Sequence, residues 1–196
     1  MLTLSGAAVG HAAQQRGIEV SGRRVETQLA TSQQLQAVLP SLRRQFEMID
    51  ALQLPQDVAE FFSSVPIVLD PRLQEMNGEY ARLDERWVVR VKPVRLPADR
   101  AIVLHELLHA YHHQVLEQPT PAIGRAYQDA RQHKLYPGEF ENAYFMKNAR
   151  EFYAVIGELY LAGPSFRPPF RCSIVMERQP EFIEYLATQF GKRRCE

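Results

Sequence analysis

The sequence predicts an α+β protein in which a small antiparallel or mixed sheet with helices comes first and a mainly helical half follows. In the first hundred residues, short stretches rich in β-branched and aromatic residues are separated by turn residues, which is typical of strands. Beyond residue 100, apolar residues recur at intervals of three and four, as in amphipathic helices. The 196 residues are enough for one domain with a substantial core. We expect residues 18–196 to form that domain, and residues 1–17 to be a flexible N-terminal arm or a leader remnant.

The strands are expected in the first half of the chain, where the apolar stretches are short and end at turn signals. The dipeptide Ser21-Gly22 separates the first two, and Asp84-Glu85 separates the last two, which we predict to be a hairpin. In the last strand Trp87, Val89 and Val91 form an apolar face that alternates with a mixed one, and Trp87 is expected in the core. The predicted strands cover residues 18–20, 24–29, 65–69, 80–83 and 86–91.

The helices are identified by their apolar spacing and by their end signals. Thr31 or Ser32 can cap the first one, in which Pro40 is a point of interruption or kinking. Asp99, with Pro97 just upstream, is expected to cap the helix that begins near residue 101. The predicted helices cover residues 32–52, 56–63, 101–113, 121–134, 148–161 and 180–190.

Composition narrows the possible partners. Lys plus Arg and Asp plus Glu both number 23, so no basic excess indicates a nucleic-acid partner. No apolar run is long enough to span a bilayer. The two cysteines, Cys172 and Cys195, leave the compartment open: a disulfide would fit a secreted or periplasmic protein, and two free buried thiols would fit a cytoplasmic one. The sequence does not indicate an oligomeric state.

The chemically most informative stretch is residues 101–113, AIVLHELLHAYHH. It contains His105-Glu106-Leu107-Leu108-His109, an H-E-x-x-H motif. On a helix, residues four apart lie one above the other, so both imidazoles can reach one Zn²⁺. Glu106 lies beside the pair, where a carboxylate can take a proton from a zinc-activated water. The adjacent His112 and His113 are interpreted as solvated.

A catalytic zinc usually takes three protein ligands, so a third is expected downstream. Glu151 lies in a helix that is otherwise rich in aromatic and aliphatic residues, where a buried carboxylate needs a partner such as a metal ion. The alternative for Glu151 is a solvent-facing position beside Arg150. Glu158 is seven residues further on a similar face, and serves as a reserve ligand or as a carboxylate that orients a histidine. Asp129 is a weaker candidate.

The motif HELLH followed by NAREFYA resembles the zincin metallopeptidases of the gluzincin type, and is most similar to the group of anthrax lethal factor and Pro-Pro endopeptidase. The resemblance covers about residues 103–154. It departs from that group at Leu107-Leu108, which replaces a pair that usually contains glycine, and at Val155, where an acidic residue often follows the ligand.

The resemblance implies a zincin-like domain and a zinc metalloendopeptidase, a hydrolase acting on peptides or proteins. It implies that Glu151 is the third metal ligand and that Tyr144 helps to stabilise the oxyanion; otherwise Tyr144 is a core aromatic. The zincin strand that precedes the histidine helix, here residues 86–91, is where an extended substrate would pair. Two alternatives remain: a non-catalytic zinc-binding or interaction module retaining the fold, and a zinc hydrolase of a non-peptide amide.

Overall fold

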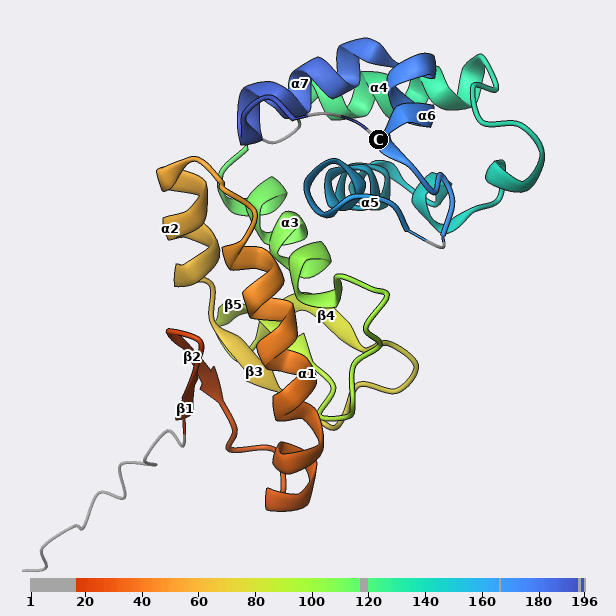
Figure 1. Cartoon of the computed structure of the whole chain (residues 1–196). Helices are drawn as coiled ribbons and strands as arrows, with labels where there is room; N and C mark the ends of the chain where they lie inside the picture. The colour runs from red at the N-terminus through yellow and green to blue at the C-terminus, as the bar shows by residue number, and fades with distance from the viewer. Residues whose placement is uncertain (1–16, 117–119, 166, 194, 196) are drawn as a thin grey trace, which may run out of the picture.

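The computed structural model has an α+β architecture with two lobes, as Figure 1 shows. It describes residues 17–116, 120–165, 167–193 and 195. A sheet lobe comes first, a lobe of helices comes last, and helix α3 (Ile102–Gln114) lies between them. The expected N-terminal arm falls outside the described residues except for Gly17, which already belongs to the first strand.

The sheet is mixed and has the strand order β1-β2-β3-β5-β4. Its outer pairs are antiparallel, and its two central pairs, β2 with β3 and β3 with β5, are parallel. The predicted 80–83/86–91 hairpin is confirmed, with Asp84 at positive φ in its turn. The strands are β1 (Gly17–Val20), β2 (Arg23–Glu26), β3 (Ile67–Leu69), β4 (Gly78–Leu83) and β5 (Arg86–Val91).

This order corrects one expectation about the substrate edge. Strand β5 lies inside the sheet, between β3 and β4, so residues 86–91 cannot pair with an extended peptide. The edge next to the histidine helix is β4, whose outer backbone groups face away from β5. Sequence alone does not identify an edge strand, because strand order depends on how the chain crosses between strands.

Six of the helices follow the predicted ranges closely. Thr31 caps α1 in a capping box with Gln34, and Pro40 lies inside that helix without ending it. The seventh α-helix of the described residues, α6, was not predicted, because its seven residues follow a proline-rich loop. The helices are α1 (Ser32–Asp50), α2 (Gln56–Ser64), α3, α4 (Pro121–Gln132), α5 (Ala149–Ala162), α6 (Cys172–Arg178) and α7 (Pro180–Phe190).

The start of α3 is capped by a residue far away in the sequence. The expected cap, Asp99, is wrong: the N-cap position is Ala101, which has no capping side chain. Gln45 of α1 does this work instead, because its Oε1 accepts from the Val103 amide at 3.1 Å and its Nε2 donates to the Arg100 carbonyl at 2.7 Å. Gln45 thus satisfies an otherwise unpaired amide of the first turn and fixes the helix against α1.

Helix α3 is buried on two sides, which explains its mostly apolar sequence. One side packs on the sheet and α1, and the other packs on α5. The crossing with α5 is close because of Gly157: a Cβ at this position would lie 3.2 Å from a Leu108 methyl carbon. Buried residues of α3 include Val103, Leu104, Leu107, Leu108 and Ala110. The close approach brings the acidic residues of α5 toward the histidines of α3.

A buried carboxylate holds the edge hairpin to the centre of the sheet. Asp70, at the end of β3, is fully buried and accepts hydrogen bonds from the guanidinium groups of Arg72 and Arg90. Arg90 of β5 also pairs with Glu79 on the edge strand β4. Hydrogen bonds from Arg72 and Arg90 outweigh the effect of burial and hold the pKa of Asp70 far below its usual range.

We expect Asp70→Asn to lower the free energy of unfolding at pH 7 by about 2 kcal/mol, because two guanidinium groups lose their charged acceptor. A lowered pKa means that this stabilisation is present above the unfolded-state pKa of about 3.9 and is lost as the pH falls below it. Urea unfolding at pH 7 and at pH 3 should therefore show a smaller difference between the two proteins at pH 3. An equal difference at both pH values would contradict the assignment.

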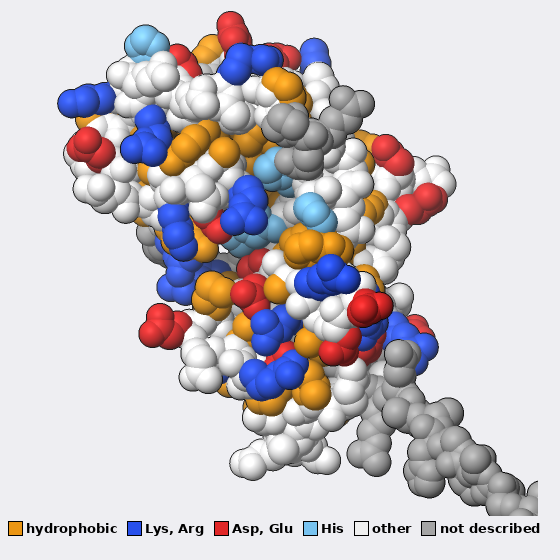
Figure 2. Space-filling model, turned by 180° about the vertical axis from the view of Figure 1, so that it is seen from behind, with side chains coloured by type: hydrophobic (Ala, Val, Ile, Leu, Met, Phe, Trp, Pro, Cys, Tyr) orange, Lys and Arg blue, Asp and Glu red, His pale blue; other side chains and the backbone are white. Residues whose placement is uncertain are grey.

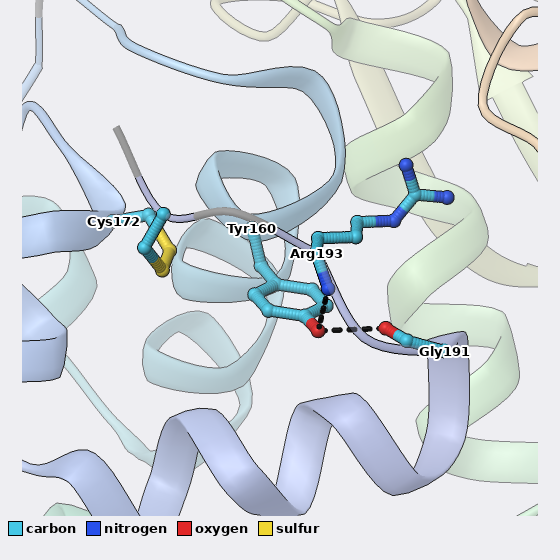
Figure 3. The surroundings of a disulfide bond; sticks show 5 residues. Tyr160, Cys172, Gly191 and Arg193 are labelled. Carbon is cyan, nitrogen blue, oxygen red and sulfur yellow. Dashed lines mark hydrogen bonds between the residues drawn. A yellow bond between two sulfur atoms is a disulfide. The ribbon is translucent and has the colours of Figure 1, made fainter.

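The C-terminal tail is fastened by a disulfide and by hydrogen bonds around Tyr160 of α5 (Figure 3). Cys172 and Cys195 are paired, with their Cα atoms 5.0 Å apart. The Tyr160 hydroxyl donates to the Gly191 carbonyl at 2.7 Å and accepts from the Arg193 amide at 3.1 Å. The Arg193 guanidinium donates to the Leu52 carbonyl of the sheet lobe. The tail therefore connects α5 with the loop between α1 and α2.

Among the described residues, no helix has both the length and the apolarity that crossing a membrane would require.

Candidate metal centre

Three side chains from two helices converge at the crossing of α3 and α5. His105 and His109 come from successive turns of α3, and Glu151 comes from the first turn of α5. One potential ligand atom from each residue lies within 4.8 Å of the other two. The two imidazole Nε2 atoms are 3.2 Å apart, and Glu151 Oε2 lies 3.3 Å from that of His105 and 3.4 Å from that of His109.

The local structure of α5 places the Glu151 carboxylate at this point. Asn148 is the N-cap, and its Oδ1 accepts from the backbone amides of Arg150 and Glu151. Glu151 Oε2 is buried and has no hydrogen-bond partner among the described residues. A buried carboxylate oxygen without a hydrogen bond is costly, and a cation bound between it and the two imidazoles would satisfy it. The donor set of two imidazoles and one carboxylate fits zinc.

Glu158 contacts the other nitrogen of His105. Its Oε2 lies 3.4 Å from His105 Nδ1, so its carboxylate is on the side of the ring that faces away from Glu151. A carboxylate at Nδ1 fixes the tautomer and the orientation of an imidazole whose Nε2 binds a metal. This geometry corresponds to the orienting role expected for Glu158 and differs from that of a ligand. Asp129 lies elsewhere, paired at the surface with His133.

The charges at the centre depend on one another. Burial opposes protonation of His105, but contacts with Glu151 and Glu158 outweigh it and raise the pKa of its imidazole to about 10. Burial also disfavours ionised Glu151, yet His105 and His109 hold the pKa of this carboxyl group well below its usual range. The centre thus keeps the Glu151 carboxylate ionised next to positive charge. A metal cation bound at the same place would supply that positive charge.

Glu106 lies beside the three converging side chains and is itself buried. Its Oε2 accepts a hydrogen bond of 2.8 Å from the backbone amide of Tyr80 on edge strand β4. Burial raises the pKa of the Glu106 carboxyl group, and the nearby His105 and His109 oppose that rise. A raised pKa suits a carboxylate that takes up a proton and gives it away.

Tyr144 is at the same place and is not a core aromatic. It belongs to the short 3-10 helix Tyr144–Met146 just before α5, and the residue is 42% exposed. Its ring centroid lies 6.4 Å from that of His105. Burial of part of the group, together with the Glu151 carboxylate, raises the pKa of the Tyr144 hydroxyl to about 12. The hydroxyl therefore remains protonated at neutral pH and can donate a hydrogen bond.

A pocket of about 340 Å³ opens next to the centre, between edge strand β4 and helix α5. Its walls combine the two lobes, and Figure 2 shows histidine side chains at the waist between them, with Lys and Arg side chains nearby. Its lining includes Ile102, His105, Glu106, Tyr144, Val155 and Glu158.

Two expectations about histidine and aromatic side chains require correction, those for His112 and Trp87. His112 is buried against Tyr153 and is not solvated. His113 is exposed, as expected, and its Nδ1 lies 2.9 Å from the Tyr80 hydroxyl. Trp87 is not in the core: 40% of it is exposed, and its ring stacks on Tyr80 at the outer end of the hairpin. Each misassignment has the same cause, because residue type and spacing do not reveal which neighbours cover a side chain.

Sequence reasoning missed two residues that shape the site. Gly78 lets the edge strand approach α3, since a Cβ there would lie 2.7 Å from an Ile102 methyl carbon and 3.0 Å from Glu106 Cγ. Tyr80 supplies the amide that holds Glu106. The available signal was a glycine two residues before the predicted strand 80–83, because a glycine in or next to a strand can mark a close backbone approach.

The comparisons with known proteins add no relative: no protein family, no curated protein and no solved structure matches this chain.

Proposed function

We propose that the protein is a zinc-dependent peptidase with a zincin-like fold, in which His105, His109 and Glu151 hold the metal ion. The observation that carries the proposal is the meeting of two imidazole nitrogens and one buried carboxylate oxygen that has no hydrogen-bond partner among the described residues. Glu106 lies next to this group at the wall of an open pocket. Structural zinc sites are closed by four protein ligands, whereas three ligands beside a pocket leave a position for water.

In the proposed reaction, Glu106, Tyr144 and Glu158 each have a separate role. Zinc, when bound, lowers the pKa of a water ligand toward about 7 and polarises the substrate carbonyl. Glu106 accepts the proton of the attacking water and passes it to the amine that leaves. The Tyr144 hydroxyl donates a hydrogen bond to the carbonyl oxygen as that oxygen gains charge. Glu158 holds His105 in the required tautomer through Nδ1.

Edge strand β4 is the surface along which an extended peptide would lie. It is next to α3, it is unpaired on its outer side among the described strands, and its Tyr80 amide lies at the Glu106 carboxylate. Backbone pairing to a sheet edge orients a peptide without depending on its sequence. The Cys172–Cys195 disulfide favours an oxidising compartment, so we propose that the enzyme works outside the cytoplasm, as a secreted or periplasmic protein.

The first test is the metal content of the purified protein, measured by mass spectrometry. We expect one zinc per chain in the wild type, and less than a tenth of that in His109→Ala and in Glu151→Ala after dialysis. Asp129→Ala is the matched control, because Asp129 is an acidic residue on a neighbouring helix whose carboxylate pairs with the surface histidine His133 and is not part of the converging group. It should retain the full amount.

The outcomes distinguish the alternatives. Zinc retained in Glu151→Ala but lost in His109→Ala would move the third ligand to Glu158. Absence of tightly bound metal in every sample, even after incubation with zinc, would contradict the proposal. Bound zinc without cleavage of any peptide would favour a non-catalytic zinc-binding module or a hydrolase of a non-peptide amide, and a panel of acylated amines would separate those two.

A further inference from the structure

We propose that the pocket beside the metal centre binds a carboxylate on the C-terminal side of the bond that is cut, through Arg100 and Arg167. This inference rests on the proposed peptidase function and specifies its substrates. The carboxylate belongs either to an Asp or Glu side chain of the substrate or to the terminus of the substrate chain. Both arginines line the pocket, together with His105, Glu106 and Tyr144.

The two arginines reach the pocket from different parts of the fold. Arg100 lies just before Ala101, the N-cap of α3, on the sheet-lobe side, and Arg167 lies in the loop that follows α5. A substrate group between them would contact both lobes. Arg167 is also close enough to Tyr144 that its charge acts on the phenol, which places it near the group that faces the substrate carbonyl.

Neither guanidinium has a carboxylate partner in the described part of the chain. Three acidic residues line the same pocket and could pair with the arginines in place of a substrate: Glu75, Glu106 and Glu158. Glu158 is engaged with His105 Nδ1, and Glu106 with the Tyr80 amide. Glu75 is exposed to solvent and forms no ion pair with either arginine. Guanidinium groups present a planar fork of donors that matches a carboxylate, so two unpaired ones lining a pocket favour an anionic group.

The position of Glu106 determines which half of the substrate enters the pocket. Glu106 delivers the proton to the leaving amine, so the fragment that carries the new amine lies on its side. Glu106 lines the pocket, whereas His109 and Glu151 do not. The first residue after the scissile bond therefore meets the apolar part of the wall, formed by Ile102, Val155 and Leu159. The carboxylate that the arginines bind is then the side chain or the C-terminus of that residue or of the next one.

The test uses the zinc-loaded full chain and a mixture of synthetic peptides of random sequence, with cleavage products sequenced by mass spectrometry. We expect Asp and Glu to be enriched at the first two positions after the cleaved bond, or cleavage close to a free C-terminus. Matched fluorogenic peptides then separate the two sources. One pair differs only by Glu or Gln at the enriched position, and a second pair ends there as a free acid or as an amide.

Loss of the relevant carboxylate should lower kcat/KM of the wild type about tenfold or more. The Arg100→Gln and Arg167→Gln variants should cleave the peptide with that carboxylate and its matched peptide without it at nearly equal rates. Lys at either position should restore part of the preference. Arg171→Gln is the control, since Arg171 is exposed in the same loop but does not line the pocket. The comparison of matched peptides uses the wild-type protein alone, so it tests the inference even if an arginine variant does not fold.

Cleavage without any preference for a carboxylate would overturn this inference and leave the peptidase function standing. A preference that persists in both arginine variants would also overturn it. If the protein binds zinc and cuts no peptide, or binds no zinc, the proposed function fails, and the pocket assignment fails with it.

Discussion

Glu106→Gln is expected to bind one zinc per chain like the wild type and to hydrolyse peptides about a thousandfold more slowly. Glutamine has nearly the same shape and can still accept the Tyr80 amide hydrogen bond through its carbonyl oxygen, so the site should keep its structure. It cannot take up a proton at neutral pH, and general acid–base catalysis of this kind contributes roughly 10²–10⁴ in rate. Metal content and kcat/KM on the same cleaved peptide are the two measurements.

Glu141→Gln is the matched control for this experiment. Glu141 is an exposed glutamate in the segment between α4 and α5, and it does not line the pocket at the candidate metal centre. Its variant should keep both zinc and activity. Unchanged turnover in Glu106→Gln would show that another group moves the proton. Loss of zinc in this variant would show that Glu106 is a ligand or is needed to shape the site.

Removal of the disulfide, by Cys172→Ser together with Cys195→Ser, is expected to lower the free energy of unfolding by about 3 kcal/mol. The bridge closes a loop with a sequence separation of 23 residues, and in the chain-entropy model a loop of this size restricts the unfolded chain by roughly that amount. For a protein of this length, the melting temperature should fall by about 6–12 °C. Thermal unfolding of the double variant measures the change.

Two comparisons make the disulfide result specific. Wild-type protein in a thiol reductant should reproduce the melting temperature of the double variant, and the reductant should not shift the double variant further. Tyr160→Phe, which keeps the bridge but removes the hydroxyl contacts to Gly191 and Arg193, should cost less, about 1 kcal/mol. A double variant as stable as the wild type would mean that these tail contacts, without the bridge, hold the tail on α5.

Local sequence signals determined most of the secondary structure. The capping box at Thr31 and Gln34, the Asp84-Glu85 turn and the Asn148 cap each act within four residues of the chain. The backbone groups that they satisfy are the ones a helix or hairpin leaves open at its ends. Such interactions do not depend on the rest of the fold, so the predicted ranges agree with the observed elements to within a few residues.

Contacts between distant segments were not accessible in this way. The cap of α3 comes from Gln45 and not from the nearby Asp99, because the two helices happen to cross there. The edge position of β4 depends on the path of the chain through the sheet. The exposure of Trp87 and the burial of His112 likewise depend on neighbours far away in the sequence.

In the candidate site, too, local spacing determined one part of the arrangement and contacts between distant segments determined the other. The sequence by itself determined that His105 and His109 share one face of a helix with Glu106 beside them, because residues four apart on a helix are always neighbours. It left both Glu151 and Glu158 as third partners, since they lie two turns apart on one face of α5. Only the tertiary structure decided between them: the close crossing at Gly157 and Leu108 sets Glu151 against the two Nε2 atoms and Glu158 against Nδ1 of His105. The angle and separation at which two helices pack depend on side chains from both helices, and no pattern within one helix contains them.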